Sequence, residues 1–257
     1  MTGLGAPNGV QVIARAAQLL RVLEVEPLGL SLTELADRVA LPRSTVHRIV
    51  AALIAEGFLA AGTLPGQVVI GPVFARMATA ATTELWRPVE PYMRLLAEQL
   101  GETVDCAVKD GSRVRVIHVI PTTSHTLRAI AETGQTFPLH CSAKGKALLA
   151  AHSAEAALDM LPSKLERLTP NTLTDREELA RNLSEVRSTG VAYSREESAV
   201  GVSCAAIALW SAARVPLAVS VVVPSQRFDL IETKVTEALL AVRRDAGSSL
   251  SSVSDAL

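Results

Sequence analysis

The side chains that could carry out chemistry are few, and several of them lie between Phe137 and Ala150. Ser142 is followed there by Lys144 and Lys146, a spacing that would allow a serine nucleophile with a lysine base. Nothing else in the sequence completes a catalytic triad. We therefore expect no enzymatic activity, and the alternative is a small-molecule enzyme whose N-terminal helices only mediate assembly.

Two other kinds of catalytic site are disfavoured by spacing. Gly145 and Lys146 resemble the end of a phosphate-binding loop, but the first glycine of that motif falls on His140. Glu196 and Glu197 are adjacent, and neighbouring residues of a strand point to opposite faces. We therefore interpret the two glutamates as solvated or salt-bridged rather than as a general acid and base.

The cysteines predict neither disulfides nor a metal centre. Cys106, Cys141 and Cys204 are widely separated and odd in number, which suits a reducing compartment. Because no C-x-x-C or H-x-x-x-H element is present, we expect buried thiols, with no metal and no cofactor. A redox sensor that uses Cys141 or Cys204 is a weaker alternative, since neither has a resolving cysteine nearby in sequence.

Length and composition indicate two unequal domains in the cytoplasm. The chain has 257 residues, and 49% of them are hydrophobic, but no apolar run reaches the roughly 18 residues of a membrane span. The segment from Met1 to Asn8 lacks the pattern of a signal peptide. We expect no membrane association. The net charge of −1 does not by itself favour nucleic acid.

The N-terminal third predicts a helix-turn-helix. Apolar spacing indicates a helix from Val10 to Glu24, and the capping box Ser31-Leu32-Thr33-Glu34 begins a second helix through about Val39. A third helix begins at Pro42 or Arg43 and is capped by Gly57. Its predicted buried stripe comprises Val46, Ile49, Val50, Leu53 and Ile54. Residues 58–61 and 67–70 read as two short strands of a wing.

The start of the third helix carries polar residues suited to DNA. In a helix-turn-helix, side chains near the start of the second helix of the motif reach base edges in the major groove. Arginine can bind guanine bidentately or pair with phosphate, whereas serine and threonine suit phosphate or water-mediated contacts. The candidate DNA-binding residues are Arg43, Ser44, Thr45, His47 and Arg48.

Beyond residue 70 the pattern mixes helices and strands. Helix is predicted over residues 71–100 with a break near Pro88 and Pro91, followed by a hairpin of 103–108 and 113–120. The further elements expected are a strand at 127–131, helices beginning near Ala143 and Ser153, a helix opened by the capping box Thr174-Asp175-Arg176-Glu177 and ended by Gly190, strands at 205–210 and 217–223, and a helix at 228–246. This order predicts a mixed α/β domain.

Three motifs in one order resemble IclR-type regulators. They are Leu41-Pro42-Arg43-Ser44-Thr45-Val46-His47-Arg48 with Glu56-Gly57-Phe58, the stretch from Phe137 to Ala150 that contains His140-Cys141-Ser142-Ala143-Lys144-Gly145-Lys146, and Glu196-Glu197 followed by Gly201-Val202-Ser203-Cys204. The resemblance runs from about Val10 to Ala246. Three ordered motifs are far more specific than a helix-turn-helix alone.

The resemblance implies an α+β chain with a winged helix-turn-helix and a GAF-like effector domain. The expected boundaries are 1–70 for the DNA-binding domain, 71–85 for a linker helix, 86–250 for the effector domain and 251–257 for a flexible tail. Family members commonly act as homodimers or homotetramers on palindromic double-stranded operator DNA, and often control catabolic operons. We expect a ligand-gated repressor or activator that responds to a small-molecule effector.

The family's effector pocket can be carried over position by position. The matching residues are Ala129, Phe137, Ala143, Lys144, Ser194, Val202, Cys204 and Ser220. The first N–H groups of the helix near Ala143 would form a positive socket, so a carboxylate-bearing effector is expected. Where the family frequently has an acidic residue shortly before the glutamate pair, this chain has Ser194-Arg195, which predicts a less acidic pocket.

Charge limits the expected affinity for DNA. Residues 1–70 contain five arginines, no lysine and five acidic residues, so this domain is electrostatically neutral. The predicted wing tip, residues 62–66, has no basic side chain. We therefore predict weak nonspecific binding by the monomer and dependence on paired half-sites.

Overall fold

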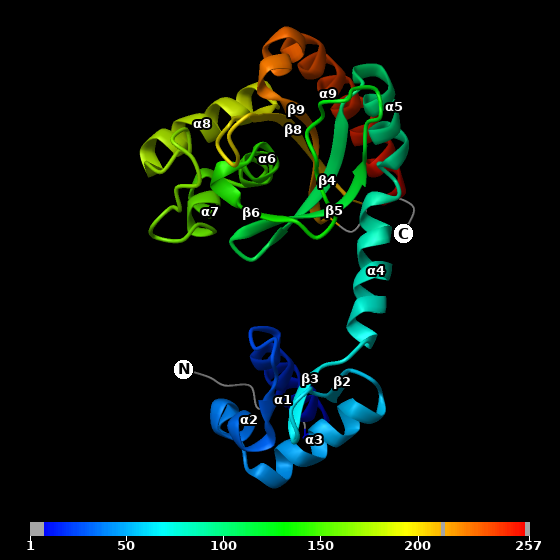
Figure 1. Ribbon diagram of the computed structural model, residues 1–257, viewed down its shortest axis with the longest axis vertical. Coiled ribbons are helices and arrows are strands. Elements are labelled where there is room, and N and C mark those ends of the chain that lie inside the picture. The colour runs from blue at the N-terminus through cyan, green and yellow to red at the C-terminus, as the bar shows by residue number, and fades with distance from the viewer. Residues whose placement is uncertain (1–7, 212–213, 255–257) are drawn as a thin grey trace. The chain divides into compact units, whose positions relative to one another are not determined.

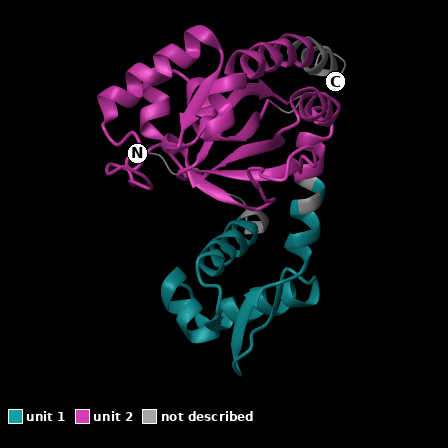
Figure 2. Cartoon of the chain, turned by 45° about the horizontal axis from the view of Figure 1, so that its top comes forward, with its two compact units in different colours: residues 1–81 teal, residues 82–257 magenta. Residues whose placement is uncertain are grey.

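The computed structural model describes residues 8–211 and 214–254 (Figure 1). The chain forms two compact units, Met1–Ala81 and Thr82–Leu257 (Figure 2). Helix α4, Val73–Trp86, crosses from one unit to the other along the chain. The finer division at residue 70, with a linker of 71–85, remains a prediction.

Unit 1 has the elements of a winged helix-turn-helix. Its helices are α1 (Asn8–Glu24), α2 (Leu32–Val39) and α3 (Arg43–Ala55), and its strands are β1 (Leu30–Ser31), β2 (Leu59–Ala61) and β3 (Gln67–Ile70). The strands form an antiparallel sheet in the order β1-β3-β2. The predicted capping box is confirmed, because the Ser31 hydroxyl accepts the N–H of Glu34 and the Glu34 carboxylate accepts the N–H of Ser31.

The core of unit 1 joins all three helices to the small sheet. Leu19, Leu23, Leu35, Val46 and Leu59 are buried in it. Gly57 follows α3 with a φ of 75°, the left-handed conformation that ends helices at low cost for glycine. The predicted stripe of α3 is wrong at one position: Ile54 is 43% exposed, because the buried side of α3 is narrower than the apolar spacing suggests.

Unit 2 is a six-stranded antiparallel sheet between two layers of helices. Its strands are β4 (Thr103–Asp110), β5 (Arg113–Ile120), β6 (Thr136–Pro138), β7 (Ala192–Arg195), β8 (Val202–Trp210) and β9 (Pro216–Pro224), in the order β6-β5-β4-β9-β8-β7. The helices are α5 (Glu90–Leu100), α6 (Ala143–Ala150), α7 (Ala154–Asp159), α8 (Arg176–Thr189) and α9 (Ser225–Ser254). The predicted mixed α/β domain is confirmed.

The two faces of this sheet differ in side-chain size. Helices α5 and α9 cover one face, where Val104, Ile207, Val219 and other large apolar residues form the main core (Figure 1). Helices α6, α7 and α8 lie on the other side (Figure 1). Residues that contribute to the cluster around α6 are mostly small: Ala129, Ala143, Ala147, Ala192, Cys204 and Ala206. Small residues allow a helix to lie close to the sheet.

Several predicted local features are wrong. Residues 127–131 are not a strand but part of the coil between β5 and β6. The helix predicted at Thr174 is capped instead by Asp175, whose carboxylate accepts the N–H of Glu178. The flexible tail of 251–257 stays a prediction: α9 continues to Ser254, and residues 255–257 lie outside the described residues. Strands β6 and β7 were not predicted.

Gly145 lets α6 begin close to the preceding turn. A Cβ at this position would lie 2.1 Å from the carbonyl oxygen of Leu139. Alanine normally favours a helix by up to about 1 kcal/mol over glycine, but the clash should dominate. We expect Gly145→Ala to lower the free energy of unfolding by about 1–3 kcal/mol, measured by urea denaturation. Ser184→Ala on the exposed side of α8 is the control. Equal or greater stability of Gly145→Ala would contradict the packing seen here.

Candidate DNA-binding and effector-binding sites

Helix α3 presents its polar residues together at its start. Arg43 is its first residue and Pro42 is its N-cap, where the fixed φ of proline suits helix initiation. Arg43 and Arg48 are exposed, while Val46 and Ile49 of the same helix are buried in the core of unit 1. The remaining predicted DNA-binding residues are the exposed Ser44 and His47 and the half-buried Thr45.

The charge of this surface differs from the charge of the domain as a whole. Arg38 is bound by Glu26 at 2.9 Å, so part of the basic charge is neutralised away from α3. Among the described residues neither Arg43 nor Arg48 forms an ion pair. Arg43 and Arg48 therefore give the start of α3 a local positive charge, although the formal charges of residues 1–70 balance. Phosphate and guanine contacts require such a charge.

Strand register brings the predicted effector residues onto one face of the sheet. Ser194 lies opposite Cys204, and Ala206 lies opposite Ser220, which in turn lies opposite Asp105. Residues that are directly opposite in neighbouring strands point to the same face. This face is the one that α6 covers.

A buried ion pair lies at the start of α6. The ammonium group of Lys144 contacts the carboxylate of Asp105, whose other oxygen accepts the hydroxyl of Ser220 at 2.5 Å. Lys144 is 4% exposed and Asp105 is 0% exposed. The Lys144 Nζ also lies 5.3 Å from the centroid of the Phe137 ring. The structure thus places Phe137, Lys144 and Ser220 close together.

The other predicted residues surround this pair with apolar and small groups. Ala129, Ala143 and Cys204 belong to one buried cluster, and Val202 packs against it. The Ser194 hydroxyl donates to the carbonyl of Cys141 at 3.3 Å. These residues are closely packed in the structure. Their roles toward an effector remain predictions.

Asp105 is the residue that sequence reasoning missed. It is the central group of the site, since it binds both Lys144 and Ser220. One signal in the sequence was usable: Asp105 is an acidic residue within an otherwise largely apolar predicted strand, and such a residue is rarely buried unless paired. Its partners could not be read from sequence, because Ser220 is 115 positions away.

Lys146 and Glu197 form a second buried pair. The Lys146 Nζ lies 2.6 Å from Glu197 Oε1, and Lys146 is 1% exposed. Burial raises the pKa of Glu197, an effect that Lys146 partly offsets. Glu196 has a φ of 58° just after β7, so the expectation that both glutamates lie in a strand is wrong. The interpretation of Glu197 as salt-bridged is confirmed.

The contacts of Ser142 disfavour the enzymatic alternative. Its hydroxyl accepts the N–H of Gly145 at 3.1 Å and so caps α6. Lys144 and Lys146 are each held by a carboxylate. A lysine that is ionised and paired cannot remove a proton from serine. Ser142 therefore positions α6.

The thiols have the properties of structural cysteines. All three are buried, and burial raises the pKa of Cys141 to about 12 and that of Cys204 to about 12. Reactive cysteines have lowered pKa values and are accessible, so the redox-sensor alternative is disfavoured.

Within the described residues, no cluster of three or more His, Cys, Asp or Glu could hold a metal ion. No helix in that part is long and apolar enough to span a membrane.

His118 makes stability depend on pH. Its ring stacks on Trp86 with centroids 3.8 Å apart, and burial lowers its pKa below 6.5, an effect partly offset by Glu90. His118 therefore binds a proton more readily in the unfolded chain than in the folded one. Its contribution to the free energy of unfolding is fully present above about pH 6.5 and is lost as the pH falls toward the lowered pKa of the folded state.

We expect His118→Phe, which keeps the stacking, to show a smaller loss of melting temperature between about pH 7.5 and about pH 5.5. Thermal unfolding followed by circular dichroism measures this difference. His140, whose pKa burial also lowers, is unchanged in both proteins and so contributes equally. An undiminished loss in the variant would show that His118 is not responsible.

Comparison with known proteins places both units in one family. The family described as the IclR helix-turn-helix domain matches residues 12–61, and the bacterial transcriptional regulator IclR C-terminal family matches residues 77–252. An HTH-type transcriptional regulator of Mycobacterium tuberculosis is 46% identical over 236 residues, 91% of this chain and 90% of that protein. The HTH-type transcriptional regulator TtgV of Pseudomonas putida is 38% identical over 248 residues, 95% of each.

A solved structure with a bound ligand has the same fold. It is an IclR homologue from Microbacterium hydrocarbonoxydans in complex with 4-hydroxybenzoate, with a TM-score of 0.66 and 25% identity, covering 96% of this chain and 100% of that one. The chain belongs to the IclR family of transcriptional regulators. It is a regulator with a DNA-binding helix-turn-helix and a C-terminal effector domain, and its relatives are named as regulators rather than as enzymes.

Proposed function

We propose that this regulator binds a palindromic operator through the start of α3 and releases or reshapes that complex when a carboxylate-bearing effector binds beside α6. Arg43 and Arg48 would contact bases or phosphates, and Ser44, Thr45 and His47 would support them. A homodimer or homotetramer would supply the paired half-sites that a neutral domain needs. The protein would act in the cytoplasm, most simply on a catabolic operon.

The single observation that carries the effector proposal is the buried Lys144 at the start of α6. The Ser142 hydroxyl accepts the N–H of Gly145 and so caps α6. The N–H groups of Ala143 and Lys144 have no carbonyl acceptor within the helix, because they come before its first intrahelical hydrogen bond. This end of a helix favours an anion. The carboxylate of Asp105 forms an ion pair with the ammonium group of Lys144. The carboxylate of an effector would compete for the same ammonium group.

Close packing predicts that effector binding moves part of the domain. Ala129 belongs to the coil between β5 and β6, and its carbonyl accepts the Thr103 hydroxyl at 2.9 Å. Ala143 and Ser220 are fully buried. An effector would therefore displace the coil around Ala129. Such a displacement gives the two states that a ligand-gated regulator requires.

Matched ligands test the proposal. The ligand named for the homologue from Microbacterium is a hydroxylated aromatic carboxylate, so 4-hydroxybenzoate and its neutral amide are the first pair. We expect the acid, and not the amide, to change operator affinity in a mobility-shift titration. If 4-hydroxybenzoate does not change operator affinity, aliphatic carboxylates are compared with their amides in the same assay. Equal effects of acid and amide throughout would contradict a carboxylate effector.

A further inference from the structure

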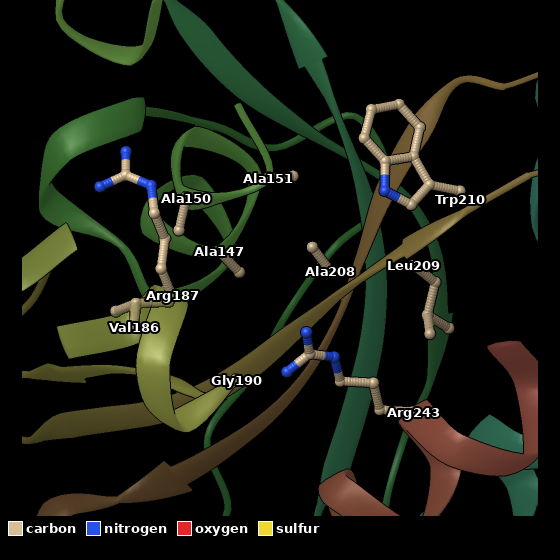
Figure 3. Close-up of a pocket in the computed structure, with 10 residues that line it drawn as sticks. All are labelled: Ala147, Ala150, Ala151, Val186, Arg187, Gly190, Ala208, Leu209, Trp210 and Arg243. Atoms are coloured by element: carbon tan, nitrogen blue, oxygen red, sulfur yellow. The ribbon is translucent and has the colours of Figure 1, made fainter. Parts of the chain in front are cut away.

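A pocket of about 270 Å³ lies at the C-terminal end of α6, whereas Lys144 lies at its start. Figure 3 shows the residues that line it. Ala147 and Ala150 come from α6, Arg187 from α8, Trp210 from β8 and Arg243 from α9. All of these elements belong to unit 2. The pocket therefore needs no contribution from the DNA-binding unit.

The charged lining of this pocket is entirely basic. Among the described residues that line it, Arg187 and Arg243 are the charged ones, and none is acidic. Over the described stretches of the chain, neither arginine forms an ion pair. By contrast, the buried Lys144 and Lys146 of this unit are each paired with a carboxylate. Two unpaired guanidinium groups in one concave site indicate an anion as ligand.

Arg187 supplies a buried donor without a partner. Its Nε donates to the carbonyl of His152 at 3.2 Å, but in the described part of the chain its buried Nη2 atom makes no hydrogen bond. The same holds for Nε2 of His152, whose ring packs edge-on against Trp210 at 6.1 Å. A buried polar atom without a partner is costly, and such atoms are commonly satisfied by a ligand or water. Arg187 lines the pocket, and His152 directly follows the lining residue Ala151 in the chain.

The position of Arg243 depends on Gly190. In Figure 3 the Arg243 side chain extends from α9 toward Gly190 and Ala208. A Cβ at Gly190 would lie 1.6 Å from Arg243 Nη1, and Gly190 has a φ of 84°. Only glycine allows both this helix end and this placement of the guanidinium group. The fold thus provides the space that brings a second cation to the pocket.

The local charge fits a monoanion. The last residues of α6 and α8 line the pocket, and each helix end carries roughly half a negative charge. Two guanidinium groups therefore leave about one unit of positive charge after the helix ends are counted. Trp210, 47% exposed, adds an indole surface, and Ala147, Ala150 and Ala208 add a small apolar lining. An aromatic ring that bears one carboxylate matches these features.

We propose that this pocket, defined by Arg187, Trp210 and Arg243, is a second ligand site that binds a small aromatic monocarboxylate. The carboxylate would take hydrogen bonds from the two guanidinium groups, and the ring would pack against the indole of Trp210 and the alanines. This site is separate from the one beside Lys144. Because the two sites touch opposite ends of α6, each can hold its own ligand.

Fluorescence of Trp210 tests this proposal directly. The chain has two tryptophans, so Trp86→Phe, which preserves an aromatic ring against His118, leaves Trp210 as the single reporter. Benzoate is the probe and benzamide is its neutral match. We expect saturable quenching or enhancement of Trp210 emission by benzoate and no saturable change with benzamide. No saturable response to benzoate, or an equal response to benzamide, would overturn the proposal.

Substitutions then assign the signal to this pocket. Arg243→Gln changes an exposed side chain, so the fold should be kept, and we expect benzoate affinity to fall about tenfold or more. Arg187→Gln should act in the same direction. The double variant Asp105→Asn/Lys144→Met alters the other site and should keep the Trp210 response. A response that survives both arginine variants, or that disappears only in the double variant, would place benzoate beside Lys144 and overturn the second site.

Discussion

Replacing both Arg43 and Arg48 with alanine is expected to abolish specific operator binding while the protein remains folded. Both side chains are exposed at the start of α3, and α3 is held from behind by Val46 and Ile49. A bidentate contact from arginine to guanine is worth about 1–3 kcal/mol. Loss of two such contacts should weaken binding by about 2–6 kcal/mol, which is about 30-fold or more, and paired half-sites increase the effect.

The matched control is Arg21→Ala, because Arg21 is also exposed in the same unit but lies on α1. Mobility shifts give the affinity, and far-ultraviolet circular dichroism verifies the fold. The slope of affinity against salt distinguishes the roles, since loss of one phosphate contact reduces it by about one. Retention of specific binding by the double variant would show that α3 does not read the operator.

Lys144→Met is expected to have the largest effect on the effector unit. It leaves the carboxylate of Asp105 buried without its cation. Breaking a buried pair in this way costs about 3–5 kcal/mol of stability. The Ser220 hydroxyl remains as a donor to Asp105, but one neutral hydrogen bond does not replace a charge. The same change removes the proposed anchor of the effector, so the response of operator binding to a carboxylate should also be lost.

Two further variants separate charge from packing. Lys109→Met removes an exposed lysine on β4 and should leave stability nearly unchanged. Asp105→Asn/Lys144→Met removes both charges and should recover much of the lost stability, because no uncompensated ion stays buried. Chemical denaturation measures all three proteins. If Lys144→Met is as stable as the Lys109→Met protein, the pair is not the structural centre of this site.

Unit 1 was largely predictable because its signals are local. The capping box at Ser31, the proline before α3 and the glycine after it each act within one helical turn. The exposed polar residues of α3 then follow from its helical period. Ile54 was misassigned because apolar spacing cannot say how wide the buried side of a helix is.

Unit 2 was less predictable because its sheet joins distant segments. Strand β4 pairs with β9, more than one hundred positions later, as in the register of Asp105 with Ser220. Nothing near Asp105 indicates that Lys144 will neutralise it. The mostly apolar segment 127–131 favours a strand, but it is coil, and the carbonyl of Ala129 accepts the Thr103 hydroxyl. The effector residues came from family resemblance, and the structure adds Asp105 to them.

The pocket at Arg187 and Arg243 was invisible in the sequence. Its lining comes from helices α6, α8 and α9 and strand β8, which are separated along the chain. Neither arginine belongs to a recognisable motif. Gly190 was predicted only as the end of a helix. Its second role, to leave space for Arg243, depends on how closely the residue that ends α8 approaches α9.

Binding of the purified protein to the DNA upstream of its own gene tests the central claim most directly. A mobility shift at two salt concentrations, with excess nonspecific competitor, is sufficient. We predict a sequence-specific shift that weakens as salt increases and is absent in Arg43→Ala/Arg48→Ala. A shift that the competitor removes completely, or that the double variant retains, would contradict operator recognition by α3.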